Sequence, residues 1–432
     1  MDKWGGVIAI RRGRPVISSL ALAMLLLAVS TAPPASAQQP GWMRAAFGGG
    51  SDVSDVDSRD FGRRWEANPP RGYPTLSPDN IAPMKAAIER YKRIVRNGGW
   101  KKIPKFNLKA GYPRGVAKLL RKRLIASGDL SRSTGGFGSY SYYVEKAVRR
   151  YQASNGLTPT GSLNRRTISA LNVSAKARLR QLRVNLNRLR RLSRSTSKKK
   201  RYIVVNIPAA QIEAVSKNRV VSRHSGVVGK AARPTPLLRS TIREMNFNKI
   251  WYLPPTVVNK DLIPKGRRMA KHGRDVLKKY HIDAYSNGRK LDPRKIHWNS
   301  SQPYRLSYSQ QPGKDNPLGF LKINFDNPYS VYMHDTPKRS IFGRNFRAAS
   351  SGCVRVQNIA KLAAWILKYN DGWGRKRIAS MRNSGKTLNV RVKKPVPLYF
   401  VYVTAWATKD GVVQFRRDLY RRDGVGLTAS AY

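Results

Sequence analysis

The sequence predicts an α+β multidomain protein in which a small helical module precedes a mostly-β domain. From about residue 80 to residue 200, apolar residues recur every three or four positions, which indicates amphipathic helices. From Tyr202 onward, short runs rich in Val, Ile and Tyr indicate strands. A chain of 432 residues suggests two or three domains, and 41 % hydrophobic residues are enough to build their cores.

The first 37 residues have the three parts of a secretory signal peptide. Three arginines precede an apolar run from Val16 to Val29, and small residues ending at Ala37 follow. The run is about 14 residues long, shorter than the ~20 that span a bilayer. We therefore expect export with cleavage after Ala37 rather than a retained anchor, and no stable transmembrane segment after signal cleavage.

The segments before the β domain follow in chain order. Residues 38–75 are rich in Gly, Asp, Arg and Pro and indicate a flexible leader. Residues 76–104 hold a helix that ends at Gly98-Gly99 and form a helical scaffold segment. Residues 105–172 predict three short helices separated by Gly-containing turns. Residues 173–200 predict a basic connector helix that packs through its leucines and turns its arginines to water.

Residues 201–408 form the predicted mostly-β domain. Strands are expected at residues 202–208, 212–215, 220–221, 245–251, 321–324, 331–333, 388–392 and 398–405. One helix is expected at residues 359–368, with Asn358 as its N-cap. Residues 254–310 are basic and irregular, so we expect an insertion there rather than more sheet. Residues 409–432 are assigned to a C-terminal tail.

The chain is strongly basic, with 84 Lys and Arg against 23 Asp and Glu and a formal charge of +61. Such a charge repels itself in the compact state and favours anionic partners. Basic proteins usually bind nucleic acid, but an exported protein meets the cell wall and an anionic envelope instead. The basic residues are also dispersed along the chain. We therefore expect an anionic envelope surface as partner, and no nucleic acid.

One cysteine and five histidines limit the possible chemistry. A single cysteine excludes an intramolecular disulfide and Cys-based zinc sites, and with so few histidines we expect no metal. Cys353 follows the small residues Ser350, Ser351 and Gly352, and His334 lies nineteen residues upstream. A thiol becomes a strong nucleophile when an imidazole takes its proton. The small residues admit a substrate carbonyl and leave the Gly352 and Cys353 amides free as an oxyanion hole.

A lone cysteine is often an inert buried thiol, but its neighbours favour chemistry here. His334, fifteen further residues and then Ser350-Ser351-Gly352-Cys353-Val354-Arg355 resemble the motif of L,D-transpeptidases with a YkuD-type catalytic domain. Ser351 replaces the second His of that motif, as in the large Gram-negative subgroup, and this leaves any third polar partner open. Residues 105–172, with their "YQ", "NGL", "TG" and "AL" elements, resemble a peptidoglycan-binding module.

The resemblance implies a β-sandwich-like catalytic domain with residues 254–310 as a capping insertion. It implies a periplasmic, wall-associated enzyme that needs no metal or organic cofactor and is acylated by carbapenems. Cys353 would attack a peptidoglycan tetrapeptide stem, release D-Ala and pass the acyl group to an amine, which gives 3→3 cross-links. His334 would be the general acid and base, and the Gly352 amide would bind the oxyanion. The candidates for substrate binding are Arg355, Ser351, Ser350 and Tyr332.

Several alternatives stay open. The same acyl-enzyme could react with water, as in an L,D-carboxypeptidase, or could release or attach a wall-anchored protein. A non-catalytic wall-binding protein is a further alternative, although the intact Cys353 and His334 argue against it. Arg355 could equally be structural, and Tyr332 could be a core strand residue. The four other histidines, His224, His272, His281 and His297, are expected at the surface or in a lid.

Overall fold

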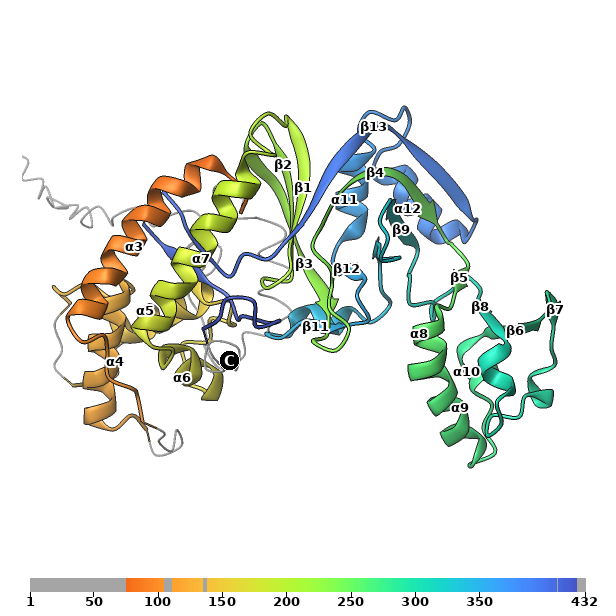
Figure 1. Cartoon of the computed structure of the whole chain (residues 1–432), viewed down its shortest axis with the longest axis horizontal. Helices are drawn as coiled ribbons and strands as arrows, with labels where there is room; N and C mark the ends of the chain where they lie inside the picture. The colour runs from red at the N-terminus through yellow and green to blue at the C-terminus, as the bar shows by residue number, and fades with distance from the viewer. Residues whose placement is uncertain (1–74, 105–110, 135–137, 410, 426–432) are drawn as a thin grey trace, which may run out of the picture. The chain divides into compact units, whose positions relative to one another are not determined.

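The computed structural model describes residues 75–104, 111–134, 138–409 and 411–425 (Figure 1). The predicted signal peptide and all but the last residue of the predicted leader lie outside the described residues. The described chain is a set of helices followed by a β-rich domain, which confirms the predicted α+β fold class.

The helices of the N-terminal half fall close to their predicted positions. They are the 3₁₀ helix η2 (Pro78–Asn80) and the α-helices α3 (Ile81–Arg96), α4 (Arg114–Ser127), α5 (Tyr142–Ser154), α6 (Arg165–Leu171) and α7 (Ala175–Ser193). Helices α4, α5 and α6 share one core, in which Leu120, Val148 and Leu171 are fully buried. This core belongs to the predicted helical module.

Helix α7 connects the module to the sheet domain and packs as predicted through its leucines. Leu182 and Leu189 are fully buried against α3 and against Tyr202 and Tyr399 of the sheet. The expectation that its arginines face water is wrong for Arg178, which is fully buried. Its guanidinium donates to Asn155, Gln181 and the Ala170 carbonyl, so hydrogen bonds offset its desolvation.

The β-rich domain is built on one mixed sheet. Its strands are β1 (Arg201–Asn206), β2 (Gln211–Ser216), β3 (Arg219–Gly229), β4 (Leu238–Phe247), β9 (Leu321–Phe325), β10 (Met333–His334), β11 (Ala348–Ser350), β12 (Val354–Val356) and β13 (Leu388–Val401). The strand order is β11-β3-β12-β10-β9-β4-β13-β1-β2, and β2 also pairs with β3. The sheet therefore curls until β2, at one end, pairs with β3, the strand next to the other end, which gives the β-sandwich-like domain that the resemblance implied.

The curled sheet encloses the main core of the domain. Apolar side chains such as Ile203, Ile323 and Val354 pack with helices α11 (Ile359–Ile366) and α12 (Arg375–Ser384). The two strands predicted at residues 388–392 and 398–405 are largely one strand, β13. An irregularity between Arg391 and Val396 interrupts its pairing with β4, and this break disrupted the sequence pattern.

The insertion between β4 and β9 folds around a core of its own. Its helices are α8 (Pro255–Val257), the π-helix η4 (Val258–Leu262), α9 (Ile263–Ala270), α10 (Val276–Tyr280) and the 3₁₀ helices η5 (Pro293–Lys295) and η6 (Gln302–Arg305). Its strands are β5 (Trp251–Tyr252), β6 (Ile282–Ser286), β7 (Arg289–Lys290) and β8 (Ser307–Gln310), in the order β5-β8-β6-β7. The prediction that this insertion contains no sheet is wrong, because strands of two to five residues leave little pattern.

The segment predicted as a C-terminal tail is packed into the domain as far as residue 425. Strand β14 (Ala405–Ala407) pairs with β15 (Val413–Phe415), across the boundary that we expected at residue 408. Asp418 and Asp423 are almost fully buried and hydrogen-bonded. The many Arg and Asp residues of this segment suggested a solvated tail, but several of them pair with each other or with helix α7.

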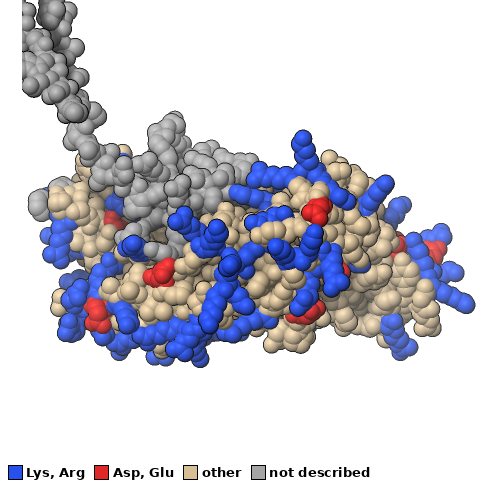
Figure 2. Space-filling view, turned by 90° about the horizontal axis from the view of Figure 1, so that it is seen from above, with Lys and Arg blue, Asp and Glu red and all other residues tan. Residues whose placement is uncertain are grey.

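Lys and Arg side chains are spread over much of the face shown in Figure 2, among few acidic ones. The even spread agrees with the dispersed charge of the sequence. Of the helices in the described ranges, none is long and apolar enough to cross a membrane.

Candidate active site

Two parallel strands bring the predicted catalytic residues together. In the pairing of β10 with β12, Met333 lies opposite Val354 and His334 opposite Arg355, and the Val354 amide donates to the Tyr332 carbonyl at 3.0 Å. Side chains alternate along a strand, and paired residues point to the same face. Met333 and Val354 therefore enter the core, where both are fully buried. Tyr332, His334 and Arg355 share the opposite face, and Cys353 directly precedes Val354 at the start of β12, where Tyr332, Lys322 and Arg355 act on its thiol.

Strand β9 adds a cation to this face that sequence reasoning missed. Lys322 pairs with His334 in the antiparallel register of β9 and β10, and its ammonium lies 4.4 Å from the centre of the Tyr332 ring. The signal was available in the run LKINF, because its alternation turns Lys322 and Asn324 away from the apolar core. Its relevance became visible only when the register placed it beside His334.

His334 is buried, with 5 % of its surface exposed, and its ring centre lies 5.5 Å from that of Tyr332. Burial lowers the pKa of His334 to about 3, and the positive charge of Arg355 acts in the same direction. Among the described residues, its buried Nδ1 atom makes no hydrogen bond. At neutral pH the ring is therefore uncharged and has a nitrogen available to accept a proton.

Cys353 is half-buried, and burial raises the pKa of its thiol. Tyr332 and the nearby charges of Lys322 and Arg355 oppose this rise but do not overcome it. Burial in turn lowers the pKa of both Lys322 and Arg355. The resting pair is thus a neutral thiol and a neutral imidazole, so any proton transfer between them would accompany the attack on a carbonyl.

The side chain of Ser350 makes hydrogen bonds within the loop that precedes Cys353. The Ser350 hydroxyl donates to the Cys353 carbonyl at 2.6 Å and accepts from the Gly352 amide at 3.2 Å. Gly352 has a φ of +118°, which favours glycine. The expectation of a free Gly352 amide is therefore wrong, and the Cys353 amide becomes the candidate oxyanion donor. Ser350 is buried and holds the loop, a position unlike that expected of a substrate contact.

Ser351 lies at the surface and is tied to the insertion through an arginine. Arg233 donates to the Ser351 hydroxyl at 2.7 Å and forms an ion pair with Asp261 of η4, also at 2.7 Å. Ser351 thus joins the loop before Cys353 to the insertion between β4 and β9. Arg233 and Asp261 were not singled out from the sequence, because they are distant from Cys353 along the chain.

The C-terminal segment also supports the loop before Cys353. The Thr235 hydroxyl donates to the Gly352 carbonyl at 2.7 Å and accepts from the Gly229 amide at 2.8 Å. The Tyr420 hydroxyl accepts from the Thr235 amide at 3.0 Å and donates to the Gly229 carbonyl at 2.7 Å. Tyr420 therefore fixes the turn that holds the carbonyl group just before Cys353.

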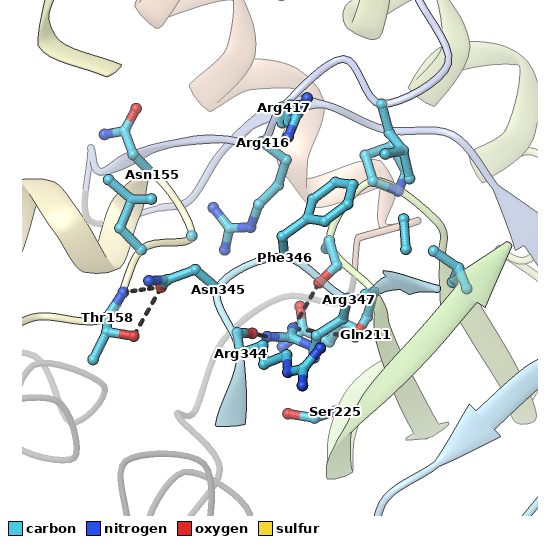
Figure 3. A pocket seen from close by; sticks show the side chains of 18 of the residues that line it. Asn155, Thr158, Gln211, Ser225, Arg344, Asn345, Phe346, Arg347, Arg416 and Arg417 are labelled. Carbon is cyan, nitrogen blue, oxygen red and sulfur yellow. Dashed lines mark hydrogen bonds between the residues drawn. The ribbon is translucent and has the colours of Figure 1, made fainter. Parts of the chain in front are cut away.

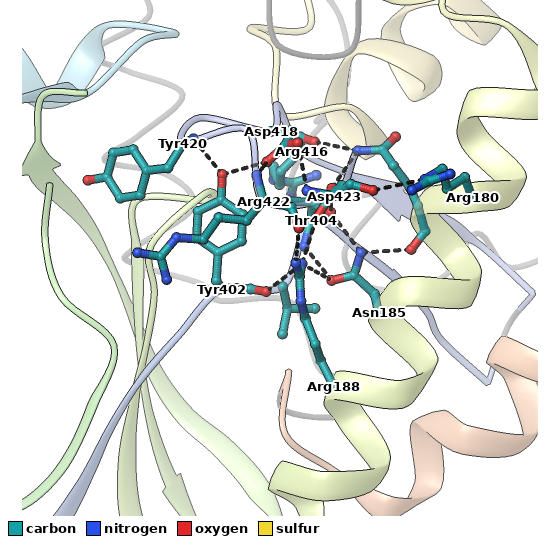
Figure 4. A network of polar contacts seen from close by, with 12 residues as sticks. Arg180, Asn185, Arg188, Tyr402, Thr404, Arg416, Asp418, Tyr420, Arg422 and Asp423 are labelled. Atoms are coloured by element: carbon teal, nitrogen blue, oxygen red, sulfur yellow. Dashed lines mark hydrogen bonds and ion pairs between the residues drawn. The ribbon is translucent and has the colours of Figure 1, made fainter. Parts of the chain in front are cut away.

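Tyr420 belongs to a larger buried network (Figure 4). Its amide donates to the Tyr402 hydroxyl, which donates to Asp418 at 2.7 Å. Asp423, close by, accepts from Arg188 of helix α7 at 2.6 Å. These contacts make the C-terminal segment part of the support of the site.

The remaining histidines differ in position. His272, His281 and His297 are exposed, as expected. His224 contradicts the expectation because only 1 % of its surface is exposed, and its ring nitrogens contact the Gln357 carbonyl at 3.0 Å and the Ser222 hydroxyl at 3.1 Å. Burial lowers its pKa to about 4. In the part of the chain that the structure describes, no group of three or more His, Cys, Asp or Glu residues is arranged to hold a metal ion.

Comparison with known families agrees with this geometry. The YkuD family, described as the L,D-transpeptidase catalytic domain, matches residues 200–396, which include His334 and Cys353. This stretch of the chain therefore resembles a YkuD domain. The family described as "Putative peptidoglycan binding domain" matches residues 116–171, which cover helices α4 to α6.

Among curated proteins, the "Putative L,D-transpeptidase" of Haemophilus influenzae is 32 % identical over 225 residues. This match covers 51 % of the present chain and 44 % of the relative, so the chain spans less than half of that protein's length.

Solved structures show weaker overall likeness. An L,D-transpeptidase from Stackebrandtia nassauensis is 12 % identical, with 69 % of this chain and 96 % of that chain covered and a TM-score of 0.25. One from Xylanimonas cellulosilytica is 14 % identical, with 70 % and 98 % covered and a TM-score of 0.22. L,D-transpeptidase 3 from Mycobacterium tuberculosis, in complex with a faropenem-derived adduct, is 10 % identical, with 46 % and 60 % covered and a TM-score of 0.22.

Proposed function

We propose that this protein is a periplasmic L,D-transpeptidase that forms 3→3 cross-links between peptidoglycan stems. The observation that supports the proposal is the register of β10 with β12, which pairs His334 with Arg355, two residues after Cys353. The YkuD domain match and the wall-binding module match support the same reaction class.

In the first half of the proposed reaction, Cys353 Sγ attacks the carbonyl that joins the third stem residue to the terminal D-Ala. As the S–C bond forms, the thiol proton passes to His334, which is neutral beforehand because burial lowers its pKa. The Cys353 amide and the positive charges of Lys322 and Arg355 stabilise the developing oxyanion. The C–N bond then breaks, His334 protonates the departing amine of D-Ala, and a thioester remains.

In the second half, an amine from another stem attacks the thioester carbonyl. His334 takes a proton from this amine, and the C–S bond breaks as the new amide forms. The proton then returns to the Cys353 sulfur, which restores the neutral pair. Because His334 gives and takes one proton in each half, the cycle needs no external acid or base.

Lys322 and Arg355 are the candidates for recognition of the stem. Both lie on the Cys353 face, and stem peptides carry free carboxylates that a cation can pair with in a desolvated site. Tyr332 packs beside His334 on the same face, where it can cover one side of the reacting carbonyl. Ser350 and Ser351 support the loop through the hydrogen bonds described above.

The test is mass spectrometry of products formed from a disaccharide-tetrapeptide by the wild-type protein and by Cys353→Ala. We expect loss of D-Ala and a cross-linked dimer with the wild type, and neither product with the variant. Loss of D-Ala with only the free tripeptide would replace transpeptidation by hydrolysis. Turnover by Cys353→Ala at the wild-type rate would contradict covalent catalysis. Thermal unfolding of both proteins checks that the variant is folded.

A further inference from the structure

A pocket of about 330 Å³ lies where the helical module meets the sheet domain, apart from the Cys353 face (Figure 3). One wall is the loop after α5, with Asn155 and Thr158, and the other is the segment from Phe342 to Ala348 before β11. The Thr158 amide and hydroxyl both donate to Asn345 Oδ1, at 2.6 and 2.8 Å. The pocket is therefore formed jointly by the two parts of the chain that the family models match separately.

The lining of this pocket is strongly cationic. Its arginines are Arg166, Arg344, Arg347, Arg416 and Arg417. Among the described residues that line it, none is acidic. Cations gathered around a concave wall concentrate anions there, because the low-dielectric protein focuses their field. The composition therefore indicates an anionic ligand.

Two of these arginines are held in place by the fold. Arg416 is 9 % exposed and donates to the Ser154 carbonyl at 2.9 Å, which links the C-terminal segment to the module. Arg347 donates to the carbonyls of Gly226 and Ala209, each at 3.1 Å. These hydrogen bonds hold both guanidiniums in fixed positions at the wall.

Two others remain available at the surface of the pocket. Arg166, on α6, and Arg344 both have exposed side chains, and neither forms an ion pair with any described residue. They come from opposite walls, one from the module and one from the sheet domain. A guanidinium binds a carboxylate through two parallel hydrogen bonds, so each of these arginines can hold one acidic group.

We infer that this pocket binds an acidic stem peptide of peptidoglycan, other than the stem that reacts at Cys353. The inference rests on the proposed function, from which it takes the identity of the polymer. Cys353, His334 and Lys322 are not among the lining residues, so a ligand here does not touch the reacting groups. The pocket would hold a neighbouring part of the wall while the reacting stem occupies the Cys353 face.

The arrangement of the lining favours a peptide over a phosphate group. The arginines are distributed over several segments, whereas a single phosphate needs them gathered at one point. Between them lie apolar side chains, Leu157, Ile207, Phe342 and Phe346, which can pack against the alanines and methylene groups of a stem. A volume of about 330 Å³ is at the lower end of pockets that take small ligands.

The test measures binding of a disaccharide-tetrapeptide by calorimetry in the Cys353→Ala background, so its result does not depend on catalysis. The pocket variant is Arg166→Glu with Arg344→Glu. The matched control is Arg165→Glu with Lys338→Glu, which changes two exposed cations outside the lining and alters the net charge equally. At about 0.15 M salt, distant charges are largely screened. We expect the pocket variant to lose one of two binding sites, and the control to retain both within twofold in affinity.

Equal stoichiometry and affinity in the two double variants would overturn the inference, since binding would then follow net charge alone. Binding of the stem with its carboxylates amidated, at unchanged affinity, would also overturn it. So would pocket-dependent binding of polyphosphate in the absence of pocket-dependent binding of the disaccharide-tetrapeptide, because the ligand would then be a phosphate polymer. Thermal unfolding of both double variants separates loss of binding from loss of folding.

Discussion

The protein has two cationic regions that differ in how their charges are held. On the Cys353 face, Lys322 and Arg355 are partly buried, and desolvation lowers the pKa of both. In the pocket between the module and the sheet domain, Arg344 and Arg166 are exposed. Arg347 and Arg416 donate to backbone carbonyls there. A charge in a desolvated site interacts strongly with a charge that forms close to it. The first region is therefore suited to a reaction, and the second to binding of an anion.

This difference predicts which measured quantity changes when a cation is removed. Beside Cys353, loss of a charge should change the rate of the chemical step and the pKa of the thiol. In the pocket, loss of a charge should change affinity only. Comparison of equivalent substitutions in the two regions therefore separates catalysis from recognition.

Among the substitutions of cations and supporting residues, Lys322→Met should have the largest effect, because it removes a cation beside Cys353 and keeps much of the side-chain volume. A nearby opposite charge shifts a pKa by about 1–3 units, and one unit corresponds to about tenfold. We expect the rate of acylation by a carbapenem at pH 8 to fall at least about tenfold, and the thiol pKa to rise. Stopped-flow mixing and intact mass measure the rate, with Lys314→Met, an exposed lysine, as control. Equal rates for the two variants would place Lys322 outside the chemistry.

A smaller effect is expected from Tyr420→Phe, because Tyr420 acts through Thr235 and Gly352 rather than on the substrate. Loss of a hydrogen bond in a positioning group is worth about 1 kcal/mol, which corresponds to roughly fivefold in rate. The first-order acylation constant should fall by that factor, while the carbapenem concentration for half-maximal rate stays constant.

The matched control for that prediction is Tyr399→Phe, which removes a hydroxyl that donates to the Ser195 carbonyl, away from the nucleophile loop. If both variants lose thermal stability equally and both slow acylation equally, Tyr420 has only a general structural role. A slower chemical step in Tyr420→Phe alone would support its role in positioning Gly352.

Much of the fold could be predicted, because the signals lie within short stretches of sequence. The helical spacing of Met84, Ile88 and Tyr91 predicted α3, and these residues are buried as expected. The prediction that Asn358 caps the N-terminus of α11 was less accurate. Asn358 adopts a φ of +49°, and its side chain makes no capping hydrogen bond to α11, because the chain turns sharply there after β12.

The residues of the candidate site also divide into those that the sequence predicted and those that it did not. Cys353 and His334 could be found from composition and motif, since only one thiol was available. Lys322, Arg233 and Tyr420 could not, because their approach to Cys353 depends on strand register and on turns formed by distant segments. The directions of the pKa shifts could not be predicted from the sequence either, since burial of His334 and Cys353 is a property of the folded sheet.

The most direct test of the proposed Cys353–His334 chemistry is the pH dependence of acylation by a carbapenem, in wild type and in His334→Ala, with peptide mapping of the adduct. Because the pKa of His334 is lowered to about 3, its base form persists in acid, and the wild-type rate should stay constant from about pH 8 down to about pH 5.

His334→Ala should be slower by about 10²–10⁴-fold at pH 7. Its rate should recover only at alkaline pH, where hydroxide ionises the thiol, because burial has raised the pKa of that thiol. An adduct on Cys353 with these two profiles is the predicted result. Equal rates for the two proteins across this range, a wild-type rate that falls with a midpoint near pH 6.5, or an adduct on any other residue would contradict it.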